Sequence, residues 1–155
     1  MQVALPFFSK PEQDAGQPSV QPGQNETENR RLLVVDDDPS VLRAVRAMAR
    51  AGGWDVIPCD GIEAAELALV RDPPDVVLLD VRMPGVRGTE GLRRVRDLAP
   101  DVAVVIMSGW VEDKVRDELE DVGHSGLFEK PFGAEALYEA LEAIWQERQN
   151  RGPEH

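Results

Sequence analysis

Acidic residues stand at the ends of two apolar segments of this sequence. Asp36 and Asp37 directly follow residues 32–35, and Asp80 directly follows residues 76–79. Such runs are typical of buried strands, and in open α/β folds ligands bind at the carboxyl ends of the strands. Carboxylates about 4 Å apart repel by roughly 4 kcal/mol at an effective dielectric of about 20, so this cluster requires a cation. Hard oxygen ligands favour Mg²⁺, and we predict a magnesium site here.

A serine hydroxyl and a lysine ammonium group are expected beside these carboxylates. Ser108 follows the apolar run 101–107, and Lys130 follows the short run 126–129. If these segments are strands of the same sheet, both side chains lie at the end that carries the carboxylates. A metal neutralises oxygens, a lysine balances charge, a hydroxyl donates a hydrogen bond and one carboxylate attacks phosphorus. The combination predicts metal-assisted phosphoryl chemistry.

Strands and helices must alternate to bring these residues together. We expect strands at 31–35, 54–58, 75–79, 101–107 and 126–129, and helices at 39–51, 62–70, 90–98, 111–122 and 134–148. Asp38 and Thr89 are expected to cap the first and third helices. Five βα repeats with short connections predict a flavodoxin-like (βα)5 doubly wound parallel sheet with strand order 2-1-3-4-5.

Composition sets the domain boundaries and excludes some functions. Residues 1–29 are rich in Pro and Gln and are predicted to be a disordered tail, followed by one folded domain at 30–148 and a flexible tail at 149–155. The net charge of −12 argues against direct binding to nucleic acid. Cys59 is the single cysteine and is expected to pack in the core. No apolar run has the length of a membrane span, so we expect a cytoplasmic protein.

Four motifs resemble the receiver domain of two-component response regulators. They are Leu-Val-Val-Asp-Asp-Asp at 33–38, Val-Val-Leu-Leu-Asp-Val-Arg-Met-Pro-Gly-Val-Arg-Gly at 76–88, Val-Ile-Met-Ser-Gly at 105–109 and Glu-Lys-Pro-Phe at 129–132. The resemblance covers about residues 31–148.

The resemblance implies a role for each residue of the set. Asp80 is the implied phosphoacceptor, and Ser108 and Lys130 are implied to contact the phosphoryl group. The implied protein ligands of Mg²⁺ are Asp37 and Asp80 directly, Asp36 through water, and the backbone carbonyl of Arg82. The Lys130-Pro131 bond is often cis in this family.

The same resemblance implies the partners. The phosphoryl group is expected to come from a sensor histidine kinase or a histidine phosphotransfer protein. The expected chemistry is self-phosphorylation and autodephosphorylation, without turnover of an external substrate. Because no DNA-binding pattern follows the last helix, we expect a stand-alone receiver that signals through protein contacts with an unknown target. The sequence leaves the oligomeric state open, and an intermediate in a phosphorelay is the alternative.

Two departures from the family pattern concern switching and phosphoryl lifetime. Leu127 stands where the family commonly has Tyr or Phe, so the usual aromatic movement is in doubt. Arg82 and Trp110 occupy the second positions after Asp80 and Ser108, with Gly109 between Ser108 and Trp110. Our hypothesis is that these bulky side chains limit attack by water and prolong the phosphorylated state. Trp110 is equally compatible with a packing role at the entry of the next helix.

A haloacid-dehalogenase-like phosphatase is the enzyme alternative. Asp36, Asp38, Ser108 and Lys130 superficially fit its motifs. That fold also needs an acidic pair after the lysine and an inserted flap after the first strand. The sequence instead has Pro-Phe-Gly-Ala at 131–134 and a helix signal directly after Asp38. A nucleotide-binding module lacks its glycine-rich loop after the first strand.

Overall fold

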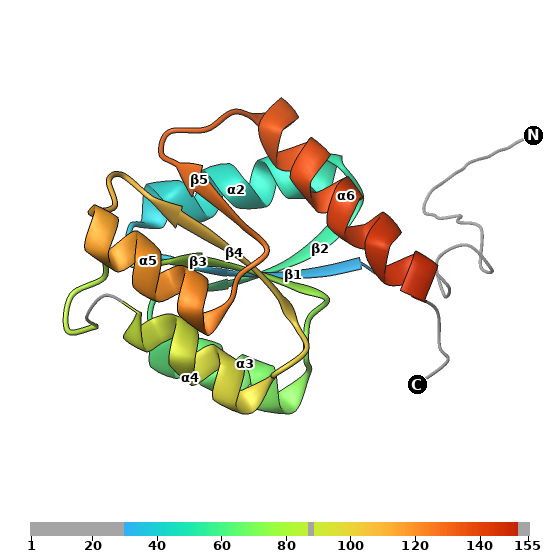
Figure 1. Ribbon diagram of the computed structural model, residues 1–155. Coiled ribbons are helices and arrows are strands. Elements are labelled where there is room, and N and C mark those ends of the chain that lie inside the picture. The colour runs from blue at the N-terminus through green and yellow to red at the C-terminus, as the bar shows by residue number, and fades with distance from the viewer. Residues whose placement is uncertain (1–29, 87–88, 152–155) are drawn as a thin grey trace, which may run out of the picture.

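The computed structural model describes residues 30–86 and 89–151. Five parallel strands form one sheet in the order β2-β1-β3-β4-β5, which confirms the predicted topology (Figure 1). The strands are β1 (Arg30–Val35), β2 (Trp54–Cys59), β3 (Val76–Asp80), β4 (Ala103–Ser108) and β5 (Gly126–Glu129). The predicted N-terminal tail lies outside the described residues.

Five helices connect and follow these strands. They are α2 (Pro39–Ala51), α3 (Ile62–Arg71), α4 (Glu90–Leu98), α5 (Asp113–Val122) and α6 (Ala134–Arg151). Several predicted bounds differ from the observed ones by one to three residues, and β4 begins two residues later than expected. α5 begins two residues later than expected, and α6 continues three residues past 148, into the segment that was predicted to be a flexible tail. No helix of the described part of the chain is long and apolar enough to span a membrane.

The helices cover both faces of the sheet, as a doubly wound fold requires. α2 and α6 lie on one face, and α3, α4 and α5 lie on the other (Figure 1). Alternate residues of each central strand point to opposite faces, so β1 sends Leu32 and Val34 into one core layer and Leu33 and Val35 into the other. The buried strands therefore hold their carboxyl ends in fixed positions.

The turn between β1 and α2 is fixed by a helix cap. The side chain of Asp38 accepts hydrogen bonds from the backbone N–H of Ser40 at 2.9 Å and from its hydroxyl at 2.7 Å, so Asp38 caps α2 as predicted. The prediction for Thr89 was half right. Thr89 is the residue before α4, but its side chain makes no capping hydrogen bond, and its Oγ1 instead accepts from Arg93 Nε at 3.3 Å.

We call the strand starts, with the helix C-termini around them, the amino end of the sheet. Parallel pairing places Arg30 beside Trp54, and the Arg30 guanidinium lies 5.7 Å from the Trp54 ring centroid and 5.1 Å from that of Trp145. The same guanidinium pairs with Glu142, and the two indoles meet edge to face at 5.8 Å. The start of β1 is thereby fixed to α6 by cation–π, ionic and aromatic contacts.

Candidate functional site

Strand register brings the predicted residues to the opposite, carboxyl end of the sheet. Val35 pairs with Leu79 across β1 and β3, so Asp36 and Asp80 follow at the same level. Ser108 is the last residue of β4 and pairs with Glu129 of β5, directly before Lys130. This register places the ends of β1, β3, β4 and β5 at one edge of the sheet.

Three carboxylates gather there. Asp36, Asp37 and Asp80 each offer an oxygen, and these oxygens lie within 4.8 Å of one another. Asp36 is fully buried, Asp80 is 3% exposed and Asp37 is exposed to solvent. Three negative charges in so small a volume repel strongly, and hard oxygen donors at this separation fit a divalent cation such as Mg²⁺.

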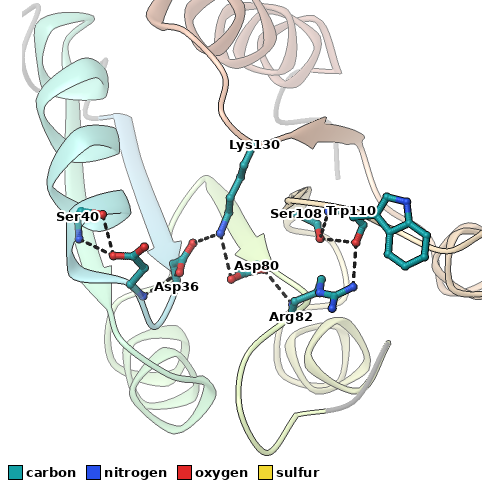
Figure 2. Close-up of polar contacts among 8 residues, drawn as sticks. Asp36, Ser40, Asp80, Arg82, Ser108, Trp110 and Lys130 are labelled. Carbon is teal, nitrogen blue, oxygen red and sulfur yellow. Dashed lines mark hydrogen bonds and ion pairs between the residues drawn. The ribbon is translucent and has the colours of Figure 1, made fainter.

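Lys130 is the cation that the chain itself supplies. Its Nζ lies 2.6 Å from Oδ2 of Asp36 and 3.2 Å from Oδ2 of Asp80, so one ammonium bridges the ends of β1 and β3 (Figure 2). The second oxygen of each carboxylate accepts a backbone N–H at 2.9 Å, from Asp38 and Arg82 respectively. The peptide bond between Lys130 and Pro131 is cis, as the resemblance implied.

The buried location changes the acidity of two groups. Burial raises the pKa of the Asp80 carboxyl, and the nearby charge of Asp36 adds to the rise, whereas the Arg82 N–H and Lys130 oppose it. Burial lowers the pKa of the Lys130 ammonium, but its hydrogen bonds and charge interactions with Asp36 and Asp80 outweigh this, and the net pKa is raised. Lys130 is therefore held in its charged form.

Ser108 is buried but engaged with its own loop. Its hydroxyl donates to the carbonyl oxygen of Trp110 at 3.0 Å and accepts from the Trp110 N–H at 3.3 Å. In this arrangement the hydroxyl hydrogen is committed to Trp110 and not to Asp80 (Figure 2).

Arg82 and Trp110 lie together on the side of Asp80 away from Lys130 (Figure 2). Arg82 Nη1 donates to the Trp110 carbonyl oxygen at 3.3 Å, and the guanidinium carbon lies 5.9 Å from the Trp110 ring centroid. The indole itself is 58% exposed. Both side chains, with Gly109, line a pocket of about 480 Å³ whose other lining residues are Asp36, Asp37, Asp38, Asp80 and Lys130.

The family comparison decides between the receiver and phosphatase interpretations. A family model described as "Response regulator receiver domain" matches residues 32–142. The chain belongs to this family. It is therefore a receiver domain of the two-component response regulator class, and the haloacid-dehalogenase interpretation is not supported.

Curated relatives of this receiver domain are longer than the chain. It is 33% identical over 117 residues to response regulator MprA of Mycobacterium leprae, covering 74% of the chain and 50% of MprA. It is 31% identical over 111 residues to C4-dicarboxylate transport transcriptional regulatory protein DctD of Pseudomonas aeruginosa, covering 72% of the chain and 24% of DctD. The chain thus spans between a quarter and a half of these relatives.

Solved structures agree on the fold. A CheY-like response regulator receiver domain protein of Methanospirillum hungatei superposes with a TM-score of 0.77 at 21% identity, covering 81% of this chain and 100% of that one. Chemotaxis protein CheY4 of Vibrio cholerae superposes with a TM-score of 0.70 at 24% identity, covering 76% and 99%. At this level of identity the likeness establishes the fold of the receiver domain alone.

The two central side chains of β5 face opposite sides of the sheet, and one backbone group of the site was not anticipated from the sequence. Leu127 is half-buried and packs into the core layer under α5, whereas Phe128 points to the opposite face and contacts Phe132 at 5.0 Å between ring centroids. The Trp110 carbonyl, which accepts from both Ser108 and Arg82, was not anticipated. A backbone group gives no signal in the sequence, so only the folded loop reveals this junction.

Proposed function

We propose that Asp80 of this receiver domain accepts a phosphoryl group in a Mg²⁺-dependent reaction. The observation that carries the proposal is the position of Asp80 on the floor of the pocket, 3% exposed and bridged by Lys130 to a second carboxylate. A buried carboxylate with little competing water is a suitable nucleophile towards phosphorus. Lys130 lies where it can balance the charge that arrives with the phosphoryl group.

The charge balance of the pocket supports a bound Mg²⁺ ion. Asp36, Asp37 and Asp80 bring three negative charges, and Lys130 brings one positive charge. We assign these carboxylates as the protein ligands, with Asp36 acting through water, together with the backbone carbonyl of Arg82. When bound, Mg²⁺ supplies the positive charge that lets phosphate oxygens enter this acidic pocket. The exposed Asp37 leaves the cation side of the pocket open to solvent.

Ser108 provides the conformational response in this proposal. An acyl phosphate on Asp80 adds acceptor oxygens and negative charge close to the end of β4. Ser108 then exchanges its hydrogen bond to the Trp110 carbonyl for one to a phosphoryl oxygen, which draws the loop after β4 inwards. Because Leu127 packs in the core, we propose that the loop and α5 move without an aromatic swing on β5.

Arg82 and Trp110 are proposed to lengthen the lifetime of the phosphorylated state. Their contact crosses one side of the pocket mouth, where water would approach Asp80. Replacing both with alanine is expected to accelerate loss of the phosphoryl group severalfold. An unchanged hydrolysis rate in the Arg82→Ala/Trp110→Ala variant would show that other groups control access of water.

The proposed donor is the phosphohistidine of a sensor histidine kinase or phosphotransfer protein, in the cytoplasm. Receiver domains act with such proteins in general. We propose that the phosphorylated domain signals through contacts with a protein target, because its net charge of −12 disfavours contact with nucleic acid.

The test is phosphorylation by a small donor. Wild-type protein incubated with Mg²⁺ and acetyl phosphate should gain one phosphoryl mass by intact mass spectrometry, and chelation of Mg²⁺ should prevent the gain. Asp80→Asn should gain none. Asp55→Asn, which changes an exposed aspartate of β2, is the matched control and should behave as wild type. An adduct of equal yield in Asp80→Asn would refute the assignment.

A further inference from the structure

A second recess opens beside the phosphoacceptor pocket. It has a volume of about 510 Å³ and lies among the loop after β3, the loop after β4 and the first turn of α5. Its apolar lining residues include Val81, Met83, Val86, Trp110, Val111 and Val115. We call this recess the apolar groove.

The wall of the groove is preformed. Residues Met83 to Val86 make a tight turn in which the Val86 N–H donates to the Met83 carbonyl at 3.1 Å. Pro84 and Gly85 occupy its central positions, and Gly85 has φ 79°, a conformation that favours glycine. Val81, Met83 and Val111 are buried beneath the surface of the groove. The apolar side chains at the base of the groove are therefore held in place by the core, between charged side chains at its border.

The groove is continuous with the phosphoacceptor pocket. Asp37, Arg82 and Trp110 line both recesses. Asp80 is buried on the floor of the pocket, so any phosphodonor reaches it through the mouth that these residues border. The part of the donor that leaves after transfer remains at the mouth. On one side it meets Lys130 and the aspartates, and on the other it meets the apolar groove.

Because the groove adjoins the pocket that contains Asp80, a group that leaves from a phosphodonor can enter it. We propose that the apolar groove binds the aliphatic leaving group of a small acyl phosphate donor, so that Val86 and Val115 select among such donors. The inference rests on the proposed role of Asp80. Asp37 and Glu112 outnumber Arg82 among the charged residues that line the groove, which disfavours an anionic substituent in the same place. An uncharged aliphatic chain gains burial there without that repulsion.

The transfer step is balanced for an acyl phosphate donor. A carboxylate oxygen of Asp80 forms a bond to phosphorus, and the bond from phosphorus to the acyl oxygen breaks. The bonding electron pair departs with the acyl group, which leaves as a carboxylate. No proton is transferred, and the total charge is the same before and after. Only the substituent on the departing carboxylate reaches the groove.

Acetyl phosphate and isovaleryl phosphate form a matched pair of probes. Their leaving carboxylates have nearly the same basicity, so their intrinsic reactivity is similar, but isovaleryl adds a branched chain of three carbons. Initial rates of adduct formation at low donor concentration, with Mg²⁺ present, give the ratio of the two rate constants. Burial of the added chain is expected to favour isovaleryl phosphate by roughly tenfold.

The groove variant is Val86→Thr/Val115→Thr, in which each replacement keeps the branched shape but adds a hydroxyl. The ratio is expected to fall towards one in this variant. Val70→Thr, at an exposed position of α3 outside the groove, is the matched control and should keep the wild-type ratio. This pattern supports the proposal.

Three outcomes would overturn it, each for a different reason. Adducts from both donors with a wild-type ratio near one would refute the groove while leaving the role of Asp80 intact. A high ratio that survives in the double variant would place the selectivity elsewhere. Failure of both donors to modify the wild type would refute the proposed function and this inference with it.

Discussion

The two ends of the sheet differ in how their charged side chains are paired. At the amino end, arginines are matched by carboxylates, carbonyl oxygens or aromatic rings: Arg30 by Glu142 and two indoles, Arg31 by Asp72, Arg96 by three carbonyls, and Arg148 by Asp75. At the carboxyl end, three carboxylates lie together and one ammonium pairs with two of them. The first arrangement pairs each of these arginines, whereas the second keeps an excess of negative charge.

This difference predicts that function and stability respond oppositely at the two ends. A substitution that removes charge from the carboxyl end should cost phosphorylation and relieve repulsion. One that removes a contact from the amino end should cost stability and leave phosphorylation intact. Substitutions at Asp80, Trp145 and Asp37 test this contrast, and Cys59 tests the burial of the adjoining core.

Asp80→Asn should have the largest effect, because it removes the proposed nucleophile. Phosphoryl incorporation should be lost completely, while the metal-free protein becomes more stable by about 1 kcal/mol, since one of three crowded charges is gone. Intact mass and thermal unfolding in EDTA measure the two effects. A lower midpoint of unfolding for the metal-free variant would contradict the idea that this end is under electrostatic strain.

Trp145→Ala should destabilise the amino end by about 3 kcal/mol, through loss of a large buried side chain and its contacts with Trp54 and Arg30. The midpoint of thermal unfolding should fall by roughly 10 °C. Below that midpoint, the extent of phosphorylation by acetyl phosphate should equal that of wild type. The midpoint of thermal unfolding of Trp145→Phe should lie between those of wild type and Trp145→Ala. Loss of phosphorylation in folded Trp145→Ala would show that the two ends are not independent.

The reactivity of the Cys59 thiol reports on solvent access to the core at the carboxyl end of β2. Burial raises the pKa of its thiol to about 11, and the charge of Asp60 adds to the effect. Only the thiolate reacts with disulfide reagents, so labelling at pH 8 should be about 100-fold slower in the folded than in the urea-unfolded protein. Labelling at similar rates in both states would indicate that water reaches this part of the core.

The raised pKa of the Cys59 thiol also makes the free energy of unfolding depend on pH. The folded state favours the neutral thiol, so the contribution of Cys59 is fully present below pH 9 and is lost as pH rises towards 11. Cys59→Ala should lack this component of the alkaline decline in the free energy of unfolding. An identical decline in both proteins would show that other groups account for it.

Asp37→Asn should have the smallest effect. Its carboxylate is exposed, so removing it should raise the metal-free midpoint by only a few degrees. The further rise that Mg²⁺ produces in the wild type should shrink or vanish, because a ligand oxygen with charge is lost. Asp55→Asn is the control and should retain the full response. An undiminished Mg²⁺ response in Asp37→Asn would remove this residue from the ligand set.

The sequence predicted the carboxyl end better than the amino end, for a physical reason. A polar residue at the end of an apolar run, such as Asp80, Ser108 or Lys130, marks the carboxyl end of a strand and a candidate site residue. Strand order then brings these residues together. The contact of Arg30 with Trp54 and Trp145 depends on strand register and on the path of α6, which no local pattern encodes. The apolar groove was missed likewise, because valines of three separate segments read as ordinary core residues.

Errors at helix boundaries have local causes. Val111 continues the apolar pattern of α5 and is buried, yet it precedes the helix, which begins at Asp113. Periodicity therefore identified its burial but not its backbone conformation. At the other end of the chain, α6 extends to Arg151 because polar residues such as Gln149 form helix readily once the preceding turns exist.

The distribution of the three tryptophans has a spectroscopic consequence. Trp54 and Trp145 are buried together at the amino end, whereas Trp110 is largely solvent-exposed and borders the pocket that contains Asp80. Intrinsic fluorescence is thus expected to combine a blue-shifted background from the buried pair with one environment-sensitive emitter beside Asp80. The wild-type chain carries its own optical probe for events at Asp80, without any attached dye.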